Sequence, residues 1–222
     1  MGKAEFKRLG HELIDTIAEF IDTIHERPVT TGETPSQIRE VLGQAALPEH
    51  GTPADALLAR ATELVLNHSL LNGHPRFLGY ITSSATPLGA LADLLAASVN
   101  PNVGANILSP MATAIEQQTI GWLAELIGLP AGYGGVLVSG GNTANFTAFL
   151  AARTAKASPH LKADGLAGTG QALVVYCSST THNWIEKAVV LFGHGTNAIR
   201  WIATDADNKM DATALQQAIT DD

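Results

Sequence analysis

The chain has 222 residues, a formal net charge of −8 and a single cysteine. This length suits one large domain or one and a half small ones. An acidic chain without a basic stripe argues against nucleic-acid binding, and no apolar run is long enough to span a bilayer. One cysteine excludes an internal disulfide. We therefore expect a cytoplasmic protein that binds neither nucleic acid nor membrane, with Cys177 as a small buried hydrophobic residue.

The first hundred residues are typical of a helical segment. Apolar residues recur at helical spacing over residues 3–26, and this broad apolar face must be buried, for which a partner subunit is one place. Further helices are expected at residues 37–42, at 53–67 with Thr52 as N-cap, and from Thr86-Pro87 to about residue 100. Between the last two, the sequence predicts a turn at 72–75 and an extended segment at 76–81.

The second half alternates between strands and helices. A helix beginning at Ser109-Pro110 and ending near residues 128–130 precedes this part. Short apolar runs then predict strands at residues 136–138, 173–176 and 198–202. The intervening helices are expected at 144–156, at 181–192 and, capped by Asp211, up to about 220, with a loop at 157–170. Such alternation predicts a parallel sheet with helices on both faces.

The most informative stretch runs from Ser139 to Asn145, where a strand leads through two glycines into a helix. The start of a helix presents unpaired N–H groups and the positive end of its dipole, and glycine lets an anion approach closely. The stretch therefore indicates a phosphate-binding turn. It matches neither the dinucleotide fingerprint nor the Walker A loop. Taken alone, it is equally well explained as an ordinary tight turn.

Two further segments are candidates for the same site. His182 follows the second predicted strand, with Thr181 expected to cap the next helix, and it would lie at the carboxyl edge of the sheet, where ligands collect. The alternative is a solvated histidine. Tyr80 lies in the turn-then-strand segment, where the alternative role is core packing.

Taken together, these features resemble the group II pyridoxal-phosphate-dependent amino-acid decarboxylases, the family of aromatic-L-amino-acid and glutamate decarboxylases. The matches run in order along the chain: His74-Pro75-Arg76-Phe77, Pro87 with Leu91-Ala92-Asp93, Ser109-Pro110 with Thr113 and Glu116, the turn from Ser139 to Asn145, His182, and Met210-Asp211 with Ala214-Leu215. So many ordered matches are more specific than any one motif.

The resemblance implies an α/β fold of the aspartate-aminotransferase type (fold type I). Residues 1–104 would be an N-terminal helical segment that wraps a dimer partner, and residues 105–222 the first part of the large domain that binds pyridoxal 5′-phosphate. The reaction would be decarboxylation of an L-amino acid to the amine and CO2. The implied site residues are Gly141, Asn142 and Thr143 at the phosphate, His182 stacked on the ring and assisting protonation, and Tyr80, Thr82 and Ser83 near the substrate, with no metal.

The family also uses a Schiff-base lysine, and none of the six lysines has its His-Lys context. That lysine would lie beyond residue 222 or on another chain. The alternatives are a non-catalytic fragment that keeps only the phosphate-binding turn and the dimerisation surface, or an unrelated nucleotide-binding module.

In the family's sheet order, residues 136–138 would lie near one edge and the other two strands toward the opposite edge. We therefore expect a homodimer partner, a complementing C-terminal polypeptide, or both. Residues 102–108 lack the Phe or Trp of the family's pocket loop, which weakens an aromatic substrate.

Overall fold

The computed structural model describes residues 1–222 apart from 44, 131, 169 and 171. The chain divides into two compact units, Met1–Pro101 and Asn102–Asp222. None of the helices in the described part of the chain is both long and apolar enough to cross a membrane. The same residues contain no cluster of three or more side chains arranged to hold a metal ion.

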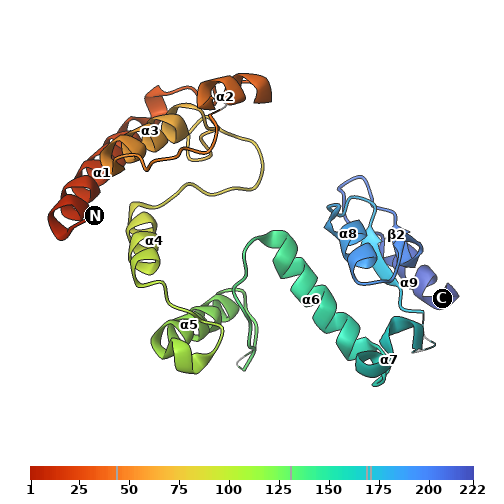
Figure 1. Ribbon diagram of the computed structural model, residues 1–222. Coiled ribbons are helices and arrows are strands. Elements are labelled where there is room, and N and C mark those ends of the chain that lie inside the picture. The colour runs from red at the N-terminus through yellow and green to blue at the C-terminus, as the bar shows by residue number, and fades with distance from the viewer. Residues whose placement is uncertain (44, 131, 169, 171) are drawn as a thin grey trace. The chain divides into compact units, whose positions relative to one another are not determined.

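The first unit is helical, as the sequence predicts (Figure 1). Its elements are α1 (Lys3–Thr23), the 3-10 turn η1 (Ile24–Glu26), α2 (Pro35–Leu42), α3 (Ala54–Asn67) and α4 (Pro87–Val99). The helix starts follow from local chemistry. Thr34 and Gln37 form a reciprocal capping box at α2, and the Thr86 hydroxyl accepts the N–H of Gly89 at α4.

The predicted Thr52 cap is wrong. Pro53 has a ψ of 138°, outside the helical range, so Pro53 itself is the N-cap and α3 begins at Ala54. The extended segment predicted at 76–81 is also wrong, because these residues form no strand and Tyr80 has a φ of 60°. Tyr80 is 86% exposed, which also excludes core packing for its ring in this unit.

His74 fastens the loop between α3 and α4. Its side chain is 2% exposed; Nε2 donates to the carbonyl of Arg27 at 3.0 Å, and Nδ1 accepts the N–H of Arg76 at 3.0 Å. Both ring nitrogens are therefore satisfied within the fold, as a buried imidazole requires. In this unit the His-Pro motif is structural.

The second unit contains the sheet. Its elements are η2 (Asn106–Leu108), α5 (Pro110–Leu126), α6 (Gly141–Lys156), α7 (Leu161–Gly168), β1 (Val175–Ser178), α8 (Trp184–Leu191), η3 (Thr196–Ala198), β2 (Ile199–Ile202) and α9 (Ala212–Asp221). The carboxylate of Asp211 accepts two N–H groups at the start of α9, so this predicted cap is confirmed.

β1 and β2 pair in parallel, with Val175 opposite Ile199, as expected of strands joined by a helix. The core of this unit joins β1, α8 and β2 through Cys177, Ile185, Val189 and Ile199. Cys177 is the buried hydrophobic residue that the sequence predicts, and burial raises the pKa of its thiol.

Three segments of this unit differ from the prediction. Residues 136–138 form no strand, because no neighbour within the described residues pairs with them. The expected loop at 157–170 contains α7, which is interrupted at Gly165 with a φ of 67°; residue 169 lies outside the described residues. Thr181 does not cap α8, whose N-cap is Asn183. The Thr181 hydroxyl instead lies 3.0 Å from the hydroxyl of Ser178.

Candidate functional site

One pocket of the second unit joins the glycine turn to the loop after β1. It has a volume of about 670 Å³ and is lined by residues 139–142, Asn145, His182 and Trp184. Three of the predicted cofactor residues, Gly141, Asn142 and His182, are thus brought together although they lie about forty positions apart in sequence. The two segments meet because α6 packs against α8.

The turn presents a set of free backbone donors. Gly140 has a φ of 93°, in the region that favours glycine, and directs the chain into α6. The first bond of the helix runs from the N–H of Ala144 to the carbonyl of Gly140 at 3.1 Å. Within the described residues, the N–H groups of Gly141, Asn142 and Thr143 are left without an acceptor, and no side chain caps them. Such a group of donors, together with the helix dipole, can hold an anion.

The hydroxyl of Thr143 is not directed into this pocket. It donates to the carbonyl of Ser139 at 3.1 Å, and Thr143 is absent from the pocket lining. Thr143 therefore contributes its backbone N–H to the turn, and its side chain stabilises the turn itself. The side-chain phosphate contact expected for Thr143 stays a prediction.

His182 lies in the loop between β1 and α8, with an exposed side chain. The N–H of Trp184 donates to its Nδ1 at 3.2 Å. Because Nδ1 accepts, the neutral imidazole carries its proton on Nε2. The ring is thus oriented by the backbone of the first turn of α8.

The sequence did not identify Trp184 and Asn145 as pocket residues. The indole of Trp184 packs edge-on against Phe149, with ring centroids 6.4 Å apart, and α8 is anchored by the buried Ile185 directly after it. Asn145 lies one helical turn after Asn142, so both amides project from the same face of α6. That three-residue spacing is a signal that could have identified Asn145.

A family model described as "Pyridoxal-dependent decarboxylase conserved domain" matches residues 35–222. The chain belongs to this family. The aromatic-L-amino-acid decarboxylase of Bacillus atrophaeus is 30% identical over 98% of this chain and 43% of its own length. Histidine decarboxylase of Drosophila melanogaster is 29% identical over 98% of this chain and 27% of its own length.

The fold agrees with this assignment. A solved structure of Oryza sativa TDC with PLP and tryptamine superposes with a TM-score of 0.86 at 25% identity, covering all of this chain and 46% of that one. The likeness confirms the predicted α/β fold of type I, of which the two parallel strands and their helices are a part. The chain spans less than half the length of these relatives.

The donor set of this pyridoxal-dependent decarboxylase family member fits pyridoxal phosphate. A phosphate dianion needs several N–H donors at one point, and the turn supplies three beside the amides of Asn142 and Asn145. A side chain added at Gly141 would meet nothing within 4 Å, so the approach to these donors is open. The imidazole of His182 supplies a flat ring in the same pocket.

The three predicted substrate residues belong to the other unit. Tyr80, Thr82 and Ser83 lie on an exposed loop of the first unit, whereas all residues of the pocket belong to the second. Their role near a substrate therefore stays a prediction.

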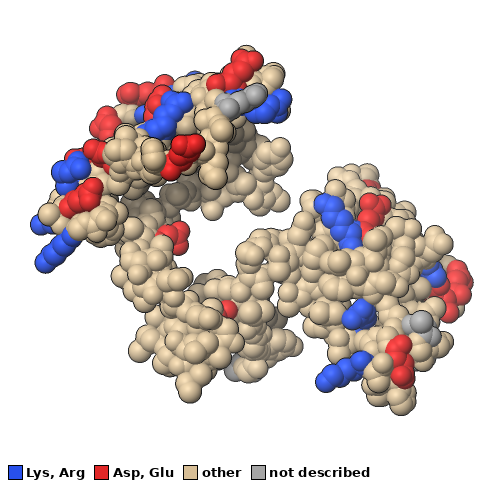
Figure 2. Space-filling view, viewed as in Figure 1, with Lys and Arg blue, Asp and Glu red and all other residues tan. Residues whose placement is uncertain are grey.

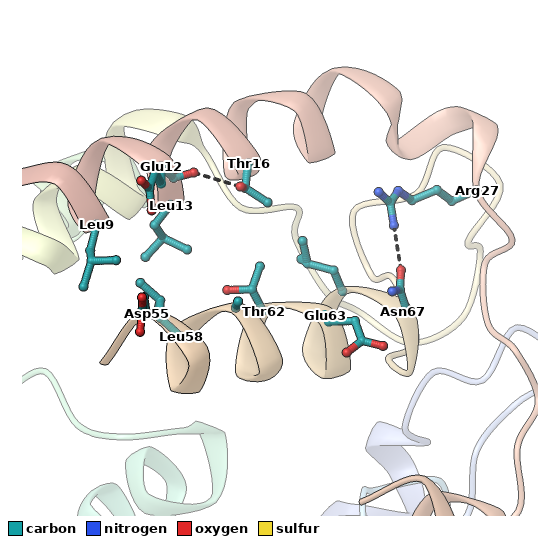
Figure 3. Close-up of a pocket in the computed structure, with 12 residues that line it drawn as sticks. Leu9, Glu12, Leu13, Thr16, Arg27, Asp55, Leu58, Thr62, Glu63 and Asn67 are labelled. Atoms are coloured by element: carbon teal, nitrogen blue, oxygen red, sulfur yellow. Dashed lines mark hydrogen bonds between the residues drawn. The ribbon is translucent and has the colours of Figure 1, made fainter. Parts of the chain in front are cut away.

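The first unit has a separate pocket of about 460 Å³ between α1 and α3, which run side by side (Figure 3). Its apolar lining includes Leu9, Leu13 and Leu58, and at one end Arg27 donates to the side-chain oxygen of Asn67 at 3.3 Å. None of the predicted site residues lines it.

Proposed function

We propose that this chain forms the cofactor-binding part of a pyridoxal-phosphate-dependent decarboxylase that converts an L-amino acid to its amine and CO2. The observation that supports this is the pocket shared by the free N–H donors of the glycine turn and by His182. An ordinary tight turn would not require a histidine to be oriented beside it. Membership of the family argues against an unrelated nucleotide-binding module.

The glycine turn, His182 and Trp184 each have a task in this reaction. The N–H groups of Gly141, Asn142 and Thr143 hold the phosphate. His182 would lie against the pyridine ring, and its Nε2–H would be the proton donor for the substrate carbon that has lost CO2. Trp184 gives the pocket an apolar wall. Pyridoxal phosphate, when bound, accepts the electron pair left by the departing CO2.

The Schiff-base lysine must come from elsewhere. None of the chain's six lysines, all within the described residues, lines the pocket. We infer that the lysine lies beyond residue 222 or on another chain. This absence also favours the second candidate, a non-catalytic piece that retains the phosphate-binding turn and a dimerisation surface.

The substrate is proposed only as an L-amino acid. Relatives named for aromatic amino acids and for histidine match this chain almost equally, at 30% and 29% identity. Residues 102–108 contain no Phe or Trp, which weakens the case for a substrate with an aromatic side chain. The single buried cysteine supports a reducing cytoplasm as the location.

Exposed apolar surface supports a partner. Figure 2 shows few charged side chains over α4 and α5, and six large apolar side chains of α5 and the residue after it are exposed: Met111, Ile115, Trp122, Leu123, Leu126 and Ile127. An apolar surface of this kind marks an interaction site. A second copy of the chain, a complementing C-terminal polypeptide, or both would cover it.

Native mass spectrometry of the purified material, before and after borohydride reduction, tests the proposal. Reduction fixes a Schiff base as a stable amine, so we expect a second polypeptide that carries the cofactor mass after denaturation, and release of CO2 from an L-amino acid. The unreduced sample is the control, because it loses the cofactor on denaturation. Only this chain, or multiples of 23.2 kDa, without bound cofactor would establish the non-catalytic alternative.

A further inference from the structure

α5 contacts the segment that leads into the phosphate-binding turn through a side-chain hydrogen bond. Oε1 of Glu116 accepts the backbone N–H of Leu137 at 2.9 Å, across 21 positions of sequence. Since residues 136–138 form no strand, this N–H has no backbone acceptor within the described residues. Glu116 takes the place of the missing strand neighbour for this one donor.

A second contact lies two residues earlier. A methyl group added at Gly135 would lie 3.0 Å from Cγ2 of Ile120, one helical turn beyond Glu116, so the backbone packs closely on α5 here. At Gly134, by contrast, an added methyl group would meet nothing within 4 Å. The segment therefore lies against α5 at two points, a packing contact and a hydrogen bond.

These contacts are directly connected to the turn. Only Val138 separates Leu137 from Ser139, which lines the pocket and whose carbonyl accepts the hydroxyl of Thr143. The N–H of Gly140 donates to the carbonyl of Val138 at 3.1 Å. A shift at Leu137 would therefore displace the carbonyls that orient the first turn of α6.

The start of α5 explains why Glu116 is in reach. Pro110 occupies the first helical position, and the hydroxyl of Thr113 donates to the carbonyl of Ser109 at 2.9 Å. These bonds fix the first turn of the helix, and Glu116 lies one turn further on. Ser109 and Thr113 thus fix the start of α5, and Glu116, one turn later, contacts the segment before the glycine turn.

We propose that Glu116 is a positioning residue for the phosphate-binding turn. Its carboxylate holds residues 135–139 on α5, and through them it aligns the free N–H groups of residues 141–143 toward one phosphate. This assignment rests on the proposed function, since it gives the turn a phosphate to bind. The hydrogen bond requires an acceptor at position 116 but no negative charge.

The test compares Glu116→Met, which removes the acceptor, with Glu116→Gln, which retains an oxygen acceptor. Glu125→Met is the matched control, because Glu125 is an exposed carboxylate of the same helix with no side-chain bond in the described structure. The probe is pyridoxamine 5′-phosphate, which cannot form a Schiff base, titrated calorimetrically into the full chain with whatever polypeptide co-purifies.

We expect Glu116→Met to weaken binding of the probe about tenfold, and Glu116→Gln and Glu125→Met to stay within about twofold of the wild type. Inorganic phosphate, which uses only the turn, should lose affinity in the same ratio. The proposal would be overturned if Glu116→Met and Glu116→Gln lost affinity for the probe equally. It would also be overturned if Glu116→Met bound the probe as tightly as the wild type. Gly135→Ala should weaken binding as Glu116→Met does, whereas Gly134→Ala should not.

Amide hydrogen exchange separates this proposal from the proposed function. Glu116→Met should speed exchange at the bonded N–H groups of Leu137 and Gly140, while Glu116→Gln preserves their protection. If the wild type binds no pyridoxamine 5′-phosphate, the proposed function fails, and exchange alone decides the role of Glu116. In that case, an unchanged exchange rate at Leu137 in Glu116→Met would refute the positioning role of Glu116.

Discussion

Replacing Ile185 by alanine should loosen the core that holds α8, and with it Trp184 at the start of that helix and His182 in the loop before it. Ile185 is 1% exposed and packs with Cys177, Val189 and Ile199. Removing a fully buried isoleucine side chain to its Cβ costs about 2–5 kcal/mol. At about 1.4 kcal/mol per factor of ten, opening of this core should become at least about 30 times more frequent.

The single cysteine reports this opening directly. Cys177 is buried and its pKa is raised by that burial, so a thiol reagent such as Ellman's reagent should react only with opened molecules, at a rate proportional to their population. Val190→Ala is the control, because Val190 lies on the same helix but is 62% exposed, and it should change the rate by no more than about twofold. Equal acceleration by both variants would refute the assignment of the core. The assignment would also be refuted if the Cys177 thiol of the wild type reacted as fast in buffer as in urea.

Three further predictions concern stability, measured as the free energy of unfolding in urea. Asp211→Ala should cost about 1 kcal/mol, since the carboxylate accepts two N–H groups at α9; an unchanged value would show that water replaces the cap equally well. His74→Ala should cost about 1–3 kcal/mol by removing the buried imidazole that bonds the carbonyl of Arg27 and the N–H of Arg76, and a neutral result would contradict the role of the histidine in fastening the loop. Burial and then the nearby Arg153 lower the pKa of His194 below its ordinary 6.5. The unfolded chain therefore binds this proton more readily, so stability is complete above about pH 6.5 and falls as the pH drops below it. His194→Gln should reduce that loss between pH 7.5 and 5.5, and an identical pH dependence in the variant would exclude His194 as its source.

Features that depend on a few neighbouring residues could be predicted from the sequence. The starts of α4 and α9 follow from Thr86 and Asp211, whose side chains bond within their own helical turn. Thr52 and Thr181 have the same side chain as Thr86, but neither of them caps a helix. In the first case Pro53 takes the cap position, and in the second the hydroxyl lies close to that of Ser178. Side-chain type therefore indicates a cap, but the local backbone selects which residue provides it.

In the site, too, features set by neighbouring residues could be predicted, and features set by packing between distant segments could not. The glycine turn is a local feature, and its free N–H groups follow from the residues that form it. The contribution of Glu116 could not be predicted in this way, because it depends on how α5 packs on residues 135–137. Thr143 illustrates the reverse, since a side chain of the right type at the right place bonds to Ser139 instead of facing the pocket.

Residues 136–138 show what sequence alone cannot decide. Val-Leu-Val has the composition of a buried strand, yet Val136 is 58% and Leu137 56% exposed, and no strand forms. A strand exists only when a neighbour completes its hydrogen bonds, and buried unpaired backbone is costly. The glycine turn is nevertheless formed, because Glu116 and Ile120 hold this segment from the side of α5. We infer that a completing polypeptide would pair with residues 136–138 while contacts with α5 already hold this segment in place.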